Sequence, residues 1–219
     1  MAGRGTSPTR EDARHWLPSQ GVDPAPLAEL NSEALGLLAL RAAEPGHREL
    51  PPLLAGLRGQ WAELPAHAVR RLSGAPFCLF DAGISHAPRW LELRTGGVHD
   101  ASHRPGAAYF DPAAACAITR RTLVYAWHLS RSRPRAACLV FGVTISAVES
   151  LAACSLALLE AAAERNAENL RPRWAHQPGF WRELLAASSA GADKRLHELL
   201  LGGISRLAAD TLAAHAAAT

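Results

Sequence analysis

The segment RAACLVFGVTISAVESL, residues 135–151, predicts two short helices joined by a tight turn. A helix-turn-helix has a small residue where its helices touch, a glycine four residues later for the turn, and apolar residues six and nine positions after that glycine. These positions are occupied by Cys138, Gly142, Val148 and Leu151. Thr144 or Ser146 is suited to cap the second helix. The spacing favours a helix-turn-helix-like element, although an ordinary pair of packed helices produces the same pattern.

The composition of the whole chain favours helices. It has 219 residues, of which 48% are apolar and only 6% are aromatic. Alanine and leucine dominate and β-branched residues are sparse; Ala and Leu lose little free energy on entering a helix. A chain of this length and apolar content can bury a sizeable core. We therefore expect an all-α fold, a helical bundle with very little sheet.

Nothing in the sequence indicates export or a membrane span. No window of about 18 or more uncharged apolar residues occurs, and the polar N-terminus lacks the apolar stretch of a signal peptide. The four cysteines form no C-x-x-C pair, which argues against a zinc ribbon or a redox site and favours small buried side chains. We expect a cytoplasmic protein with no membrane partner.

Glycine, proline and periodic apolar residues divide the chain into four parts. We expect a disordered tail over residues 1–24, an N-terminal helical unit over 25–84, a linker or long loop over 85–111 and a C-terminal helical domain over 112–219. Asn31 is suited to a cap within the first helix, and Asp111 to the cap of the helix that starts at Pro112. The apolar periodicity predicts helices at residues 26–44, 50–56, 60–72, 112–130, 135–141, 146–153, 155–165, 181–187 and 193–217.

A weak internal repeat relates the two helical units. LLALRAAE (37–44), LLAGL (53–57), ELPAHAVRRL (63–72) and APFCLF (75–80) have the same rhythm as VYAWHLSR (124–131), LVFGV (139–143), ACSLALLEAAAE (153–164) and NLRPRW (169–174). A true duplication would make the chain a tandem of two related units, which would bury against each other as the subunits of a homodimer do. Leu/Ala-rich helices also imitate one another by chance, so both interpretations stay open.

Basic residues concentrate in the second half of the chain. The net charge is +3, and residues 120–219 hold 12 basic and 8 acidic side chains, against 11 and 12 in residues 1–119. The candidate DNA-binding residues are Arg120, Arg121, Arg131, Arg133, Arg135, Thr144, Ser146, Arg171 and Arg173. No acidic residue lies between Pro112 and Val148, so the arginines of this stretch could hold phosphates without reading sequence. A solvated face beside a helix end is the alternative. The predicted second helix has no Arg, Lys, Asn or Gln to reach base edges, so it would read bases poorly.

Searches for catalytic patterns find none. The chain has no G-x-S-x-G elbow, no phosphate-binding G-x-x-x-x-G-K-[ST] loop, no H-E-x-x-H pair and no G-x-G-x-x-G fingerprint. Its ten histidines are scattered and show no convincing metal-ligand spacing. We expect a protein that is not an enzyme and that uses no cofactor and no metal.

Four segments of the second half carry a family resemblance. They are the apolar helix Leu123–His128 before a basic turn, the run RPRAACLVFGVTISAVESLAACSLALLEAAAERN (133–166), LRPRW (170–174), and RELLAAS (182–188) followed by ADKRLHELLLGGISRLAADTL (192–212). In this order they resemble the FlhD family of flagellar transcriptional regulators, whose Ala-rich helix, apolar-Gly-apolar turn, "LAE-N" helix, aromatic and basic segment and closing helices they match. The resemblance covers roughly residues 121–212, and the N-terminal half would be a diverged copy.

The resemblance implies an α-helical subunit that dimerises and contributes to promoter DNA binding with a second protein. The implied partners are duplex DNA and an FlhC-like protein or RNA polymerase, and the implied role is activation of flagellar or motility genes. This chain is nearly twice as long as is typical of the family, so a homodimer and an intramolecular pseudo-dimer are both open. The alternative is a helical protein-protein adaptor of a flagellar or type III secretion system that binds no DNA. Salt-dependent binding to duplex DNA would favour the regulator.

Overall fold

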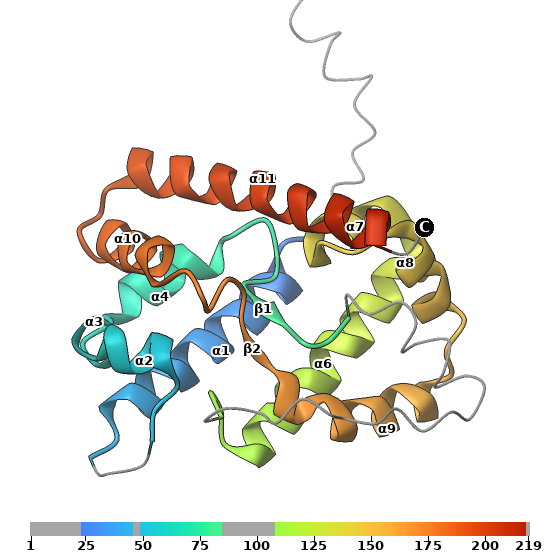
Figure 1. Ribbon diagram of the computed structural model, residues 1–219, viewed down its shortest axis with the longest axis horizontal. Coiled ribbons are helices and arrows are strands. Elements are labelled where there is room, and N and C mark those ends of the chain that lie inside the picture. The colour runs from blue at the N-terminus through green and yellow to red at the C-terminus, as the bar shows by residue number, and fades with distance from the viewer. Residues whose placement is uncertain (1–22, 46–48, 85–107, 218–219) are drawn as a thin grey trace, which may run out of the picture.

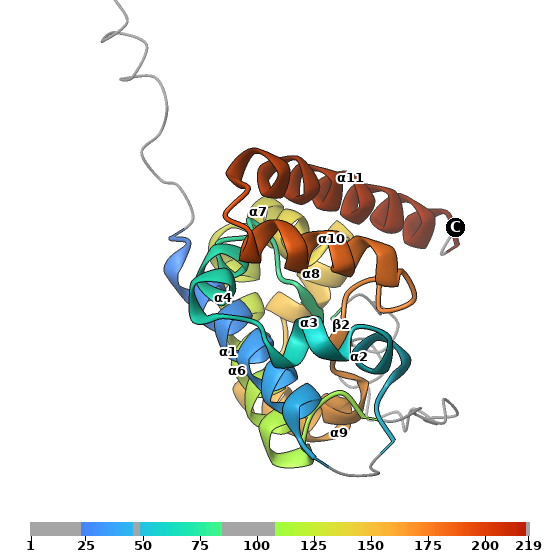
Figure 2. The ribbon, with the colours of Figure 1, turned by 90° about the vertical axis from the view of Figure 1, so that its left-hand side faces the viewer.

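The computed structural model describes residues 23–45, 49–84 and 108–217, which form a predominantly helical fold (Figures 1 and 2). Within these ranges the only sheet has two short strands, so the predicted all-α helical bundle is confirmed. The predicted tail, except for its last two residues, and most of the predicted linker lie outside the described residues. In the part of the chain that the structure describes, no single helix is long and apolar enough to cross a membrane.

The N-terminal helices follow the sequence signals with one exception. They are α1 (Ala25–Ala43), α2 (Pro52–Gly56), α3 (Arg58–Ala62) and α4 (Ala66–Ser73). The single helix predicted over residues 60–72 is wrong, because the chain turns between α3 and α4 and Pro65 precedes α4 as its N-cap residue. Proline has no N–H to donate inside a helix and disfavours a helical conformation of the residue before it, so it separates the two helices.

The described part of the second half, residues 108–217, contains six α-helices, at or near the predicted positions. They are α6 (Pro112–Ser132), α7 (Pro134–Phe141), α8 (Ile145–Ala152), α9 (Leu156–Asn166), α10 (Pro178–Ser189) and α11 (Asp193–Ala217), and the 3-10 helix η2 (Ala167–Asn169) follows α9. Asp111 caps α6 as predicted, since its Oδ1 accepts a hydrogen bond from the N–H of Ala113 at 2.9 Å. Helix α10 begins three residues earlier than predicted, at Pro178, because proline is well suited to the first turn of a helix.

The two strands connect parts of the chain that are far apart in the sequence. Strand β1 (Phe80–Asp81) follows α4, and β2 (Arg171–Pro172) follows η2. They pair antiparallel, with Phe80 opposite Pro172 and Asp81 opposite Arg171. The apolar segment that leads into β1 thereby runs through the interior of the fold.

Asn31 holds this interior segment in place. It lies in the middle of α1, fully buried, where its Nδ2 donates to the carbonyl of Phe77 at 3.1 Å and its Oδ1 accepts from the N–H of Leu79 at 2.9 Å. A buried side-chain amide needs such partners, and here main-chain groups of an extended segment provide them. The prediction that Asn31 caps a helix is therefore wrong.

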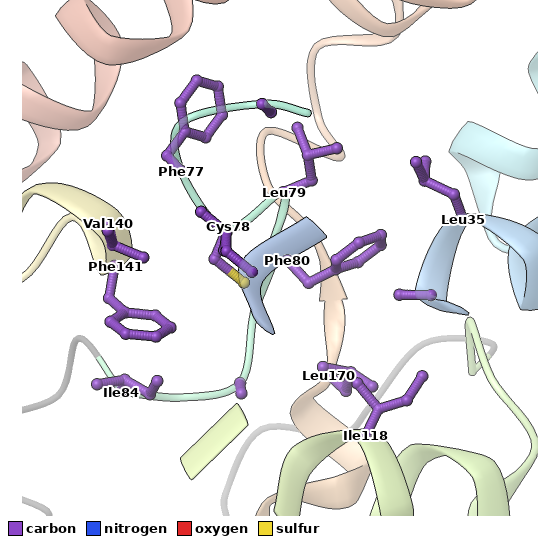
Figure 3. Packing of buried hydrophobic residues seen from close by; sticks show 14 of the residues in the cluster. Leu35, Phe77, Cys78, Leu79, Phe80, Ile84, Ile118, Val140, Phe141 and Leu170 are labelled. Atoms are coloured by element: carbon purple, nitrogen blue, oxygen red, sulfur yellow. The ribbon is translucent and has the colours of Figure 1, made fainter. Parts of the chain in front are cut away.

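One hydrophobic core extends through both predicted helical units. Figure 3 shows the segment Phe77–Phe80 surrounded by side chains of other elements, among them Leu35 of α1 and Phe141 of α7. Helix α10 covers the N-terminal helices, where Trp181 packs against Trp61 with ring centroids 5.4 Å apart. Helix α11 crosses from α10 to α7 (Figure 1). Residues 25–45 and 49–84 are thus packed on residues 112–217 along a shared interior.

Candidate nucleic-acid interface

The predicted helix-turn-helix-like element is formed by α7 and α8. Their axes bend by 115° across a three-residue turn, in the range found for helix-turn-helix pairs. Gly142 begins the turn at φ 58° and ψ 49°, a left-handed conformation that L-residues with a side chain adopt only at a cost. A Cβ at this position would lie 2.4 Å from Cδ2 of Leu207 on α11. The left-handed backbone therefore favours glycine here, and a larger residue would also displace the end of the Leu207 side chain.

Thr144 and Ser146 act locally at the start of α8. The Thr144 hydroxyl accepts a hydrogen bond from the N–H of Ala147 at 3.3 Å, which makes Thr144 the N-cap residue. Its Oγ1 also lies 2.9 Å from Oγ of the exposed Ser146. One of the two hydroxyls therefore donates to the other, and both predicted DNA-binding residues already have an intramolecular partner.

Helix α6 fixes the position of this element. The Tyr125 ring packs edge-on against Phe141 at the end of α7, with centroids 5.9 Å apart. Trp127 Nε1 donates to the carbonyl of Cys154, just after α8, at 3.0 Å. Burial raises the pKa of the Tyr125 phenol above its ordinary value, so this ring stays neutral where it packs. Helices α7 and α8 are thus held at both ends by side chains of α6.

The outward face of α8 has no Arg, Lys, Asn or Gln, as predicted. Ile145, Ser146 and Glu149 are exposed on it, and Ile145 keeps 49% of its surface. Leu139 of α7 and Leu156 at the start of α9 are also exposed, at 71% and 52%. An apolar side chain and a carboxylate cannot donate to the phosphate backbone or to purine acceptors. Helix α8 therefore lacks the long donor side chains that most often read bases in a major groove.

A basic face lies along α6 instead. Arg120, Val124, His128 and Arg131 are all exposed and recur within about 80° around the helix axis. The helix contains no Asp or Glu over its 21 residues. Arg120 and Arg131 stand about 16 Å apart along the axis, and exposed Arg135 follows in the first turn of α7. We call Arg120, His128, Arg131 and Arg135 the α6 basic face.

Two of the predicted arginines near this face already have partners within the fold. Arg121 forms an ion pair with Glu33 of α1. Arg133 is half-buried in the link between α6 and α7. The Arg131 guanidinium lies over the Trp127 ring, 4.8 Å from its centroid, which orients the side chain while leaving it exposed.

Arg173 does not join the α6 basic face. Its Nε donates to the carbonyl of Cys78 at 2.8 Å, and its Nη2 donates to the carbonyl of Phe141 at 2.5 Å. It therefore ties β2 to the interior segment and to the C-terminal end of α7. Arg171 is exposed on β2. It lies opposite Asp81 in the strand pair, so an acidic residue is its direct neighbour on β1. Arg173 is thus engaged within the fold, and Arg171 lies on a strand and not on α6.

Burial dominates the titration of the groups that Arg171 and Arg173 approach. It raises the pKa of the Cys78 thiol, and the nearby Arg173 guanidinium only partly opposes this effect. It also raises the pKa of the Tyr109 phenol, an effect that Arg171 opposes in the same way. Both groups are therefore neutral near pH 7, and neither is an activated nucleophile.

His128 belongs to the basic face but is not among the residues predicted from the sequence. The sequence does contain a signal for it: His128 follows Arg120 by eight residues, and this spacing places both residues on the same side of a helix. Trp127 was likewise missed as the ring beneath Arg131. Both could have been found by projecting the arginines of α6 onto a helix rather than reading them as one basic run.

In the described ranges no group of three or more His, Cys, Asp or Glu side chains could hold a metal ion. Within the same ranges the four cysteines are free thiols, of which Cys78 and Cys154 are buried as predicted, whereas Cys116 and Cys138 are partly exposed.

Comparison with known proteins gives no match: no protein-family model, no curated protein and no solved structure matches this chain.

Proposed function

We propose that this chain is a regulatory protein that holds the phosphate backbone of duplex DNA with its α6 basic face and leaves the choice of sequence to a partner protein. The observation that carries the proposal is a 21-residue helix without a carboxylate, whose exposed side presents Arg120, His128 and Arg131. Such a surface attracts a polyanion at long range and holds it at short range.

The dimensions of the face suit a nucleic-acid backbone. Duplex DNA carries one negative charge per about 1.7 Å of its axis, so a stripe about 16 Å long can meet several phosphates. Arginine forks donate two hydrogen bonds to one phosphate, and the Arg131 fork is pre-oriented by Trp127. The outward face of α8 offers no donor for base edges except the Ser146 hydroxyl, which already has a partner. Sequence choice would therefore come from another protein.

The family resemblance supports the same role. FlhD-type proteins contribute to promoter binding within a complex, and the proposed partner here is an FlhC-like protein or RNA polymerase. Activation of flagellar or motility genes in the cytoplasm would then be the biological setting.

Fluorescence anisotropy with two labelled duplexes of unrelated sequence tests the proposal. We expect similar affinity for both duplexes and a steep fall in affinity between about 50 and about 200 mM salt. Three or four phosphate contacts correspond to a slope of about −3 in log affinity against log salt. Absence of binding at low salt, or binding that salt does not weaken, would rule out the phosphate-binding role. A strong preference for one duplex would rule out its dependence on a partner for sequence.

A protein-protein adaptor is the second candidate. It is favoured by the exposed apolar side chains of Leu139, Ile145 and Leu156 on the successive helices α7, α8 and α9, since exposed apolar surface is used for docking. Replacing Leu139 and Ile145 by serine would then release a co-purified partner that nuclease treatment leaves bound. If the same variant keeps its partner and the basic-face variant loses it, the adaptor role through these residues is excluded.

A further inference from the structure

The N-terminal helical unit and the first part of the C-terminal one, residues 112–172, have a similar order of elements, and α10 and α11 have no counterpart in the N-terminal unit. α1, α2, α3, α4 and β1 occur in the order of α6, α7, α8, α9 and β2. Helix α1 packs against α3 and α4, as α6 packs against α8 and α9 (Figure 1). Two of the four pairs of similar sequence fall on corresponding places. Residues 37–44 and 124–131 cover the C-terminal turns of α1 and α6, and residues 63–72 and 153–164 cover most of α4 and α9 with the turns before them.

Contacts between the units join corresponding elements. Helix α1 lies against α6, where Glu33 forms the ion pair with Arg121, and β1 pairs with β2. The strand pairing is antiparallel, as a two-fold axis between equivalent strands requires. In these two places an element meets its own counterpart, as in the isologous interfaces of symmetric homodimers, whereas α10, which has no counterpart in the N-terminal unit, packs against α3 and α4. In this chain the interface is made within one molecule.

Charge is reversed between the two long helices. When residues 37–44 are placed on residues 124–131, Glu44 falls on Arg131, and the same register puts Glu33 on Arg120. Glu33 is engaged by Arg121. Glu44 pairs with Arg41, the only arginine of α1, at 2.5 Å. At the positions of Arg120 and Arg131, α1 and its C-cap residue thus present carboxylates, each paired with an arginine, whereas the same register places Arg41 on His128.

From this pairing we infer that the chain is a built-in pseudo-dimer with one DNA-binding unit: α6 holds the phosphate backbone and α1 does not. The inference rests on the proposed function. Carboxylates repel phosphates, and a carboxylate facing DNA lowers affinity instead of adding a contact. A symmetric homodimer offers the same face twice and matches two-fold symmetric sites. This chain has the basic face only once, on α6. One chain therefore binds one stretch of DNA backbone, and a palindromic site should not raise its affinity.

Two single substitutions at opposite units test the inference in the full-length chain. Arg131→Gln removes a charge from the α6 basic face, and Arg41→Gln removes one from α1. We expect Arg131→Gln to reduce the salt slope by about 1 and the affinity at 0.1 M salt about eightfold. Arg41→Gln should leave both quantities unchanged. Light scattering on the wild-type protein should give the mass of one chain, 23.3 kDa.

The outcomes separate this inference from the proposed function. If the wild-type protein binds no duplex, both fail. If it binds and Arg41→Gln weakens binding as much as Arg131→Gln does, both units engage DNA and only the inference of one DNA-binding unit is overturned. A solution mass of two chains would overturn the inference of a built-in pair, because the two units of one chain would then not replace the two subunits of a dimer. Circular dichroism on both variants verifies that each remains helical.

Discussion

Removing the three arginines of the α6 basic face should abolish most DNA affinity without unfolding the protein. Arg120, Arg131 and Arg135 are exposed, so none of them is part of the hydrophobic core. Each phosphate contact contributes about 0.9 to the salt slope, so the triple alanine variant should lose about 2.7 from it. At 0.1 M salt the affinity should fall by two to three orders of magnitude, a factor of roughly 500. Fluorescence anisotropy over a salt series measures both quantities.

Stability should change little in this variant. The largest loss is the contact between Arg131 and Trp127, worth about 0.5–1 kcal/mol at an exposed site. This corresponds to a fall in Tm of less than about 4 °C for a chain of this size. The matched control removes equal charge elsewhere, at exposed residues of α4, α10 and α11, namely Arg70→Ala, Arg182→Ala and Lys194→Ala. If this control loses as much affinity as the basic-face variant, net charge rather than the α6 face attracts DNA and the reasoning is refuted.

Three further predictions concern the interior. Gly142→Ala should lower the free energy of unfolding by about 2 kcal/mol, because alanine is strained in the left-handed conformation and its Cβ displaces Leu207. Chemical denaturation measures this loss, and an unchanged denaturation midpoint would contradict the turn geometry. Arg173→Ala should cost about 2–3 kcal/mol because two main-chain carbonyls lose a charged donor, yet the DNA salt slope should stay constant; a reduced slope would place Arg173 on the DNA. The pKa of Cys78 is raised above 9.0 in the fold, so the thiol ionises more readily in the unfolded chain and stability should fall as pH rises above that value; Cys78→Ala should reduce this fall, and a stability that stays level to about pH 10 would argue against burial of the thiol.

Local signals were sufficient for most helices. Asp111 before Pro112 marked the start of α6, and Gly142 marked the turn between α7 and α8, because caps and left-handed turns depend on the residues that form them. Pro65 was available in the same way and was overlooked within a Leu/Ala-rich run. Asn31 was beyond local reasoning, since its partners lie more than 40 residues away in the sequence.

In the candidate site, too, some residues could be predicted from local sequence and others depend on distant partners. Arg120 and Arg131 could be predicted because an acid-free helix exposes its arginines to solvent. Arg173 could not be distinguished from them by composition, since its carbonyl partners come from the interior segment and from α7. The ion pair of Arg121 depends likewise on the packing of α1 against α6. Residues whose role is set by distant partners require the structure.

Site-specific photo-crosslinking tests the central claim most directly. A photoreactive phenylalanine analogue at Val124, which is 39% exposed between Arg120 and His128, should crosslink to duplex DNA at low salt and lose the crosslink as salt is added. The same analogue at Leu201 of α11, which is 49% exposed, should give no crosslink. Equal crosslinking at both positions, or crosslinking at Leu201 alone, would contradict DNA binding through the α6 basic face.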